Sequence, residues 1–224
     1  MSLETSKTLG GIGAILLLVG TLPVISTYTY GIIWLAGLIL VLTALYRLAS
    51  FYNEKEIFNN ALYGVITGVV GAVVTGIVAV IAILASLSSL ETFIGEFYPG
   101  WIPGDWASLS GITPTIPNTI DFSPLASFLA AIAAIFAVTI IFAVVATYFF
   151  RRSLKLLSVK TTVGLFSTAG LMLFIGAFLL IIFILPGLIV MWLAVLILAI
   201  AFFQIKPQQT PMTTAASPPT ATSA

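Results

Sequence analysis

The polar residues that could carry chemistry are concentrated in one short stretch, FYNEKEIFNNALYG, at residues 51–64. Its polar side chains include Glu54, Lys55, Glu56, Asn59 and Asn60. Together they could bind a small ligand at a membrane face. They could also mark a turn between two helices, with Asn59 or Asn60 as an N-cap, because an Asn side chain accepts hydrogen bonds from the free N–H groups at a helix start. We favour the turn, since no other part of the chain points to a binding site.

Other kinds of chemistry are limited by the residues that the chain lacks. Its 224 residues include no cysteine and no histidine, which removes thiolate nucleophiles and the commonest general base and metal ligand. The hydroxyls of Ser167 and Thr168 are expected to bond to preceding carbonyls. We therefore predict no catalytic, cofactor-binding or metal-binding residue and expect that the protein is not an enzyme. A net charge of +1 provides no basic surface for nucleic acid.

Composition indicates a membrane protein. Hydrophobic residues make up 60% of the chain and charged residues only 7%, whereas soluble domains carry about 25% charged residues. Apolar runs near the length of roughly 20 residues that a membrane helix needs recur six times. They lie at about 9–26, 30–48, 61–85, 125–149, 161–185 and 187–205. The sequence thus predicts an all-α, polytopic integral membrane protein, with a six-span domain over residues 1–206.

The basic residues all fall on one side of such a six-span arrangement. Besides Lys7 and Lys206 near the ends, they are Arg47 and Lys55 after the second run and Arg151, Arg152, Lys155 and Lys160 after the fourth. The opposite side carries Glu91, Glu96, Asp105 and Asp121, without a calcium-loop spacing. The positive-inside rule then places both termini in the cytoplasm, with the protein in the cell membrane.

Several segments at the ends of the apolar runs, and between them, carry recognisable sequence signals. Residues 86–124 are predicted to be a long outer loop whose aromatic side chains lie at the bilayer interface, as a cover or as a surface that contacts a partner. Ser123 is a plausible N-cap with Pro124 after it, and Pro186 and Gly187 predict a tight turn. Pro23 is the only proline well inside an apolar run. Residues 207–224, rich in Pro, Thr and Ser, are predicted to be a disordered cytoplasmic tail.

Small residues predict close helix packing in the centre of the bundle. The third run carries Gly64, Gly68, Gly71 and Gly76, and the fourth carries Ala130 and Ala134. Small residues let helix backbones approach closely, which drives association in lipid. We expect the third and fourth runs to pair within the chain. A homo-oligomer contact through the same surface is the alternative.

A weak internal repeat relates the two ends of the chain. IIWLAGLILVL at 32–42 is similar to VMWLAVLILAI at 190–200. This similarity suggests a parallel duplication of a helical hairpin, spans one–two and five–six, around a central hairpin of spans three–four.

The stretches SKTLGGIGAILLL at 6–18 and IFNNALYG at 57–64 resemble an archaeal membrane-protein family known as domain of unknown function 996. The resemblance implies an archaeal cell-membrane protein without an assigned activity, and it brings no catalytic or ligand residues.

By elimination, the sequence favours a non-catalytic scaffold or accessory subunit that contacts lipid and a membrane-protein partner or a second copy. The alternative is a transporter or channel for small neutral solutes, lined by Gly and Thr residues of the third span.

Overall fold

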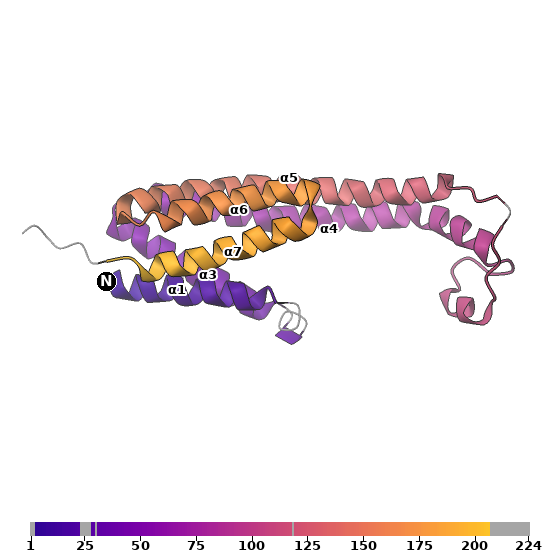
Figure 1. The fold of residues 1–224 in the computed structure, drawn as a ribbon, viewed down its shortest axis with the longest axis horizontal. Helices are drawn as coiled ribbons and strands as arrows, with labels where there is room; N and C mark the ends of the chain where they lie inside the picture. Colours follow the sequence, from indigo (N-terminus) through magenta and orange to yellow (C-terminus); the bar gives the residue numbers. More distant parts are fainter. Residues whose placement is uncertain (1–2, 23–27, 30, 118, 207–224) are drawn as a thin grey trace, which may run out of the picture.

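The computed structural model describes residues 3–22, 28–29, 31–117 and 119–206, and these residues form helices and loops without a strand (Figure 1). Pro23 and the tail at 207–224 lie outside the described residues. The α-helices are α1 (Leu3–Gly20), α3 (Ile32–Phe51), α4 (Lys55–Phe97), α5 (Ser123–Thr161), α6 (Leu165–Ile182) and α7 (Ile184–Phe203), with a short 3-10 helix, η1 (Trp106–Gly111). The all-α prediction is confirmed for this part of the chain.

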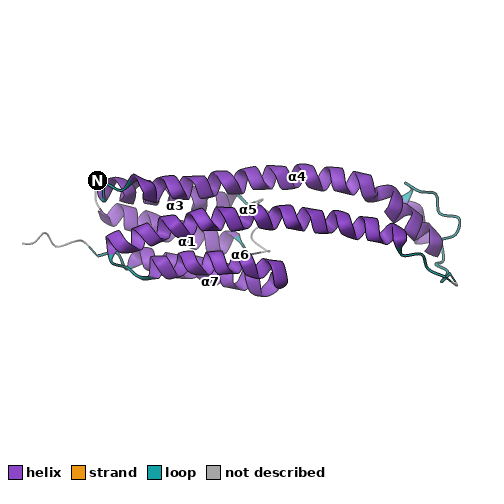
Figure 2. Cartoon of the chain, turned by 90° about the horizontal axis from the view of Figure 1, so that it is seen from above, coloured by secondary structure: helices purple, strands orange, loops and turns teal. Residues whose placement is uncertain are grey.

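The six α-helices are all long and apolar enough to cross a membrane, but they are unequal. Four of them have 18–20 residues, which corresponds to about 27–30 Å at 1.5 Å per residue. The other two, α4 and α5, have 43 and 39 residues, or about 64 and 58 Å. These two helices run side by side and project well beyond the other four (Figures 1 and 2).

The helices form a closed ring. Among the described residues, each α-helix contacts the next one in the chain, and α7 contacts α1. One apolar cluster with residues from all six helices fills the ring near the end at which the described chain begins and finishes. Phe166 and Phe202 are fully buried there, and their rings meet edge to face at 5.1 Å.

The predicted pairing of the third and fourth runs is the contact between α4 and α5. A Cβ added to Gly64 would lie 2.8 Å from the ring of Phe150, and one added to Gly71 would lie 2.5 Å from the Cβ of Phe142. These glycines are seven residues apart. Contacts recur at this interval when two helices cross at a shallow angle.

Other small residues predicted for this packing surface face outward. Gly68 and Gly76 have no atom within 4 Å of an added Cβ, and Ala130 and Ala134 are exposed. Four-residue spacing alone could not tell which of the glycines would face α5, because the crossing angle decides it.

Helix boundaries differ from the predicted runs at several places. Residues 86–97, expected to be loop, continue α4, which ends where Tyr98 precedes Pro99, a position that disfavours helix. At the start of α5 the N-cap residue is Phe122, so the predicted Ser123 cap is one residue off. Asp121 performs the capping instead, since its Oδ1 accepts a hydrogen bond from the Ser123 N–H at 2.9 Å.

The turn between α6 and α7 also differs from the prediction. Phe183 alone separates the two helices, and Pro186 lies in the first turn of α7, where a missing N–H costs little. Gly187 contributes to packing, because its added Cβ would lie 3.0 Å from the carbonyl oxygen of Gly176.

The proposed duplication stays a prediction. Both outer hairpins, α1–α3 and α6–α7, are paired antiparallel helices with the same direction in the bundle (Figure 1). However, the glycines in close contact are Gly13, Gly20 and Gly37 in the first hairpin and Gly176 and Gly187 in the second. These positions are not equivalent in the predicted repeat.

Gly37→Ala is expected to destabilise the α1–α3 hairpin, because its Cβ would lie 2.6 Å from the backbone nitrogen of Leu17. Overpacking of this kind costs about 1–3 kcal/mol. The thermal unfolding midpoint in detergent measures the effect. Gly76→Ala is the matched control, since its space is open and the exchange raises helix propensity. An equal response of the two variants would contradict the close packing.

Candidate functional site

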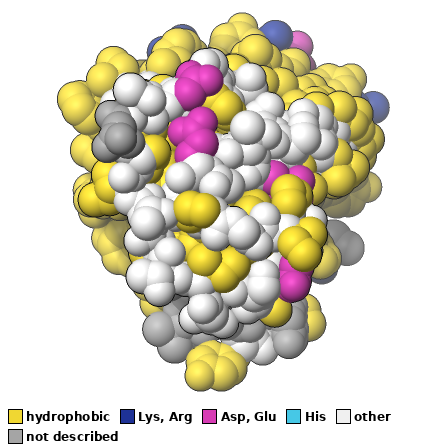
Figure 3. Space-filling view, turned by 90° about the vertical axis from the view of Figure 1, so that its right-hand side faces the viewer, with side chains coloured by type: hydrophobic (Ala, Val, Ile, Leu, Met, Phe, Trp, Pro, Cys, Tyr) yellow, Lys and Arg dark blue, Asp and Glu magenta, His cyan; other side chains and the backbone are white. Residues whose placement is uncertain are grey.

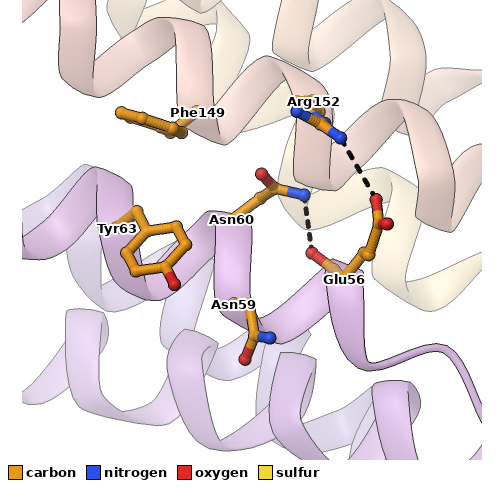
Figure 4. Close-up of a pocket in the computed structure, with 6 residues that line it drawn as sticks. All are labelled: Glu56, Asn59, Asn60, Tyr63, Phe149 and Arg152. Carbon is orange, nitrogen blue, oxygen red and sulfur yellow. Dashed lines mark hydrogen bonds and ion pairs between the residues drawn. The ribbon is translucent and has the colours of Figure 1, made fainter.

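Residues of the polar stretch at 51–64 form ion pairs between the start of α4 and the last part of α5. Glu56 Oε2 lies 3.3 Å from Arg152 Nη2, and Glu54 Oε2 lies 3.0 Å from Lys160 Nζ. Figure 4 shows the first pair together with the side chains around it. These ion pairs connect residues about a hundred positions apart in the sequence, so only the folded chain brings them together.

The prediction that Asn59 or Asn60 is an N-cap is wrong. Helix α4 begins at Lys55, and Glu54 occupies the cap position without a side-chain cap bond. The Asn60 Nδ2 donates a hydrogen bond to the Glu56 carbonyl oxygen at 2.7 Å inside the helix. The helix starts earlier because Glu56, in the first turn, suits the positive end of the helix dipole.

Ser153 is the buried polar contact that the sequence reasoning missed. Its hydroxyl donates to the Ile57 carbonyl oxygen at 2.6 Å, and its side chain is fully buried between α5 and α4. A seven-residue step from Ala146, which contacts Gly64, could have indicated that Ser153 faces α4.

A shallow, open hollow of about 250 Å³ lies beside the Glu56–Arg152 pair. Its lining residues are Glu56, Asn59, Asn60, Tyr63, Phe149 and Arg152 (Figure 4). Both ion-pair side chains are more than half exposed, and they neutralise each other. No group of three or more His, Cys, Asp or Glu side chains in the described part of the chain could hold a metal ion. The arrangement is therefore suited to joining two helices at a wet surface.

The basic residues of α4 and α5 that were predicted to determine topology all lie at this same end. Lys55 starts α4, and Arg151, Arg152, Lys155 and Lys160 lie in the last part of α5. Arg47 lies near the end of α3, next to the same elbow. The Arg151 guanidinium also lies over the Phe174 ring, 5.1 Å from its centroid.

The opposite end carries acidic side chains on a small folded cap. Figure 3 looks onto this end and shows Asp and Glu side chains on it, with Lys and Arg only at its edge. Trp101 is buried beside Trp106, and its Nε1 donates to the Asp105 carbonyl oxygen at 2.7 Å. Hydrogen bonds from the Ser123 hydroxyl and backbone N–H lower the pKa of Asp121. This capping interaction is present at neutral pH and is lost as the pH falls through that lowered pKa.

Six apolar helices with charged residues gathered towards the ends define a multi-pass α-helical membrane protein. Residues 33–197 match the family described as "Protein of unknown function (DUF996)". The chain belongs to this family, as the resemblance of its stretches 6–18 and 57–64 implied; the family match covers α3 only from its second residue and does not include α1.

A relative of similar length supports this membership. The chain is 33% identical over 205 residues to the uncharacterized protein MJ1644 of the archaeon Methanocaldococcus jannaschii, with 92% of this chain and 94% of the relative aligned. No solved structure matches the chain.

Ser153→Ala is expected to lower the free energy of unfolding by about 0.5–1.5 kcal/mol, because a buried hydrogen bond between α5 and α4 is lost. Thermal unfolding in detergent measures it. Ser50→Ala is the control, since the Ser50 hydroxyl donates only within its own helix, to the Tyr46 carbonyl oxygen at an exposed position. A loss no greater than that of the control would show that the Ser153 contact does not hold the helices together.

Proposed function

We propose that the protein is a non-catalytic membrane scaffold or accessory subunit of the cell membrane, with both termini in the cytoplasm. The observation that carries the proposal is that its buried polar atoms already take part in hydrogen bonds within the chain. Every buried side-chain nitrogen or oxygen of the described residues has a hydrogen-bond partner. Most of those partners are carbonyls of the same helix, as for Ser86 and Thr147.

A transport or catalytic site in a bundle needs polar groups that face a shared space, and such groups are costly in lipid unless they are used. Here the hydroxyl of Thr168 lies 3.4 Å from the Gly164 carbonyl oxygen of its own helix. The ring interior near the basic end is filled by apolar side chains. These contacts leave helix surfaces, rather than a pocket, as the part of the molecule available for function.

One such surface lies on the outward side of α4. Gly68, Ala72 and Gly76 recur at four-residue spacing, so they share a helix face. All three are exposed, and added Cβ atoms at Gly68 and Gly76 would meet nothing within 4 Å. In lipid, a face of small residues lets a second helix approach closely. We infer that a helix of a second copy or of another membrane protein packs on this face.

Gly68→Leu combined with Gly76→Leu is expected to weaken this association about tenfold, equivalent to about 1.4 kcal/mol, because the larger side chains hold the second helix away. Crosslinking in liposomes measures self-association, and co-purification from native membranes measures partner binding. Val73→Leu, at an exposed position that is not part of the face, is the control. The recovery of wild-type protein only as isolated monomers without a partner would contradict the scaffold.

The second candidate function is a pore for small neutral solutes. The closed ring of six helices favours it, because a solute path could run along the axis that the ring encloses. The apolar cluster that fills this centre weighs against a continuous water path. We expect purified protein in liposomes to give no flux of small neutral solutes, such as glycerol and urea, above that of empty liposomes. Flux that depends on the protein would favour the pore over the scaffold.

A further inference from the structure

The long and short helices are offset along the bundle axis. An added Cβ at Gly170 of α6 would lie 3.1 Å from the Cα of Arg151, and the Arg151 guanidinium lies over Phe174. Phe174 is in the middle of α6. The middle of α6 is therefore level with the charged end of the apolar run of α5, and not with the middle of that run.

This offset determines the position along α5 at which the tip of the α6–α7 hairpin lies. Ile182, the last residue of α6, is 12 residues beyond Gly170, which corresponds to about 18 Å. The tip is then level with α5 near Thr139. From Thr139 to Ser123, α5 continues for 16 more residues, or about 24 Å. Figures 1 and 2 show the resulting projection of α4 and α5 beyond the tip.

A band of exposed apolar side chains on α4 and α5 has the length of a bilayer core. Large exposed hydrophobic side chains run from Tyr63 to Leu84 on α4 and from Leu129 to Tyr148 on α5. These distances of 21 and 19 residues correspond to about 32 and 29 Å, close to the 30 Å of hydrocarbon in a typical bilayer. The most apolar 18-residue windows of α4 and α5 are only 6% and 0% buried, so these windows need lipid around them.

Charged side chains bracket this band at both ends. Glu56 and Arg152 lie just beyond Tyr63 and Tyr148 at one end, and Glu91 and Asp121 lie beyond the other. Both helices thus place their charges outside the same layer.

We propose that the bilayer core surrounds this band of α4 and α5, and that the α6–α7 hairpin enters from the cytoplasmic side and ends inside the hydrocarbon. The composition of the tip fits lipid. Ile182, Phe183 and Leu185 are 70%, 61% and 73% exposed. From Ala169 to Phe203 the hairpin has no charged residue, and the Trp192 indole is its only side chain with an N–H or O–H donor.

A bilayer centred instead on the four short helices fits less well. Arg151, level with Gly170 and Phe174, would lie well inside the hydrocarbon, where charged side chains are costly and rare. The outer halves of the apolar runs of α4 and α5 would stand in water with their hydrophobic side chains exposed. The proposed position of the bilayer avoids both costs.

The distribution of basic residues agrees with either position. A hairpin that enters and leaves through one face keeps Lys160 and Lys206 on the same side, as two full spans would. Helix α1 of the first hairpin reaches no deeper than the α6–α7 tip. Gly10 of α1 lies against Phe202, which packs on Phe166, and Gly20 is ten residues, or about 15 Å, further along α1.

The absence of cysteine from the chain makes single-cysteine variants of the full-length protein in liposomes the direct test. Leu185→Cys marks the tip, and Leu84→Cys marks the outer end of the band. A fluorophore at position 185 is expected to be quenched at least twofold more by lipids spin-labelled at mid-chain than by lipids labelled at the headgroup. A fluorophore at position 84 should show the opposite preference. Neither free thiol should react with a membrane-impermeant maleimide as fast as Ser110→Cys on the outer cap.

Stronger quenching at position 185 by the headgroup label, or rapid reaction of its thiol from the side that Ser110→Cys marks, would overturn the proposal. Ile182→Cys, exposed on the same tip, provides a second position if Leu185→Cys does not fold. The inference does not rest on the scaffold function, because these depth measurements have the same outcome whether or not a partner is bound.

Discussion

The structure depends on one constraint, which is that hydrocarbon offers no hydrogen bonds to a polypeptide. Each backbone N–H and C=O in lipid must find a partner within the chain, and an α-helix meets this need locally. Side-chain hydroxyls follow the same rule here. The hydroxyls of Thr43, Ser86 and Thr139 all donate to the carbonyl four residues earlier. Helices whose backbone and hydroxyl groups are already hydrogen-bonded have few polar groups free to bond to a neighbouring helix. They therefore associate mainly through the complementary shapes of their surfaces.

The forces that hold the helices together differ between the two ends of the molecule. Near the basic end, all six helices contribute to one apolar cluster that includes Leu45, Leu157 and Phe202. Where this end of the bundle meets water, the hydrophobic effect can drive the burial, at about 1.5–3 kcal/mol for a large side chain. Along the apolar band of α4 and α5, the contact between the two helices depends on close packing, and Gly64 and Gly71 provide it in the half nearer the basic end. The exposed Glu56–Arg152 ion pair at the α4–α5 junction adds only about 0–1 kcal/mol.

Several features of the fold could be predicted because they depend on local composition. Apolar length identified six helices, and small residues identified α4 and α5 as a close pair. The missed details depend on neighbours. Whether Asn60 or Glu54 begins α4 is decided by a balance of small capping terms, and the continuation of α4 through Phe97 reflects the absence of any helix breaker before Pro99. The Ser153 contact with Ile57 joins residues 96 positions apart, so a seven-residue spacing could indicate the face of α5 that Ser153 shares but not the carbonyl that it meets.

The sequence by itself determined the suitability of the chain for lipid, its all-α class and the grouping of the basic residues at one end of the helices. It did so because hydropathy and charge are properties of each residue and need no knowledge of its neighbours in space. Only the tertiary structure decided how far each helix is displaced along the bundle axis and which glycines contact another helix. Axial displacement and helix rotation are set by side chains that interlock across the ring, such as Arg151 over Phe174 and Phe142 against Gly71. Those contacts exist only once separate segments have packed together.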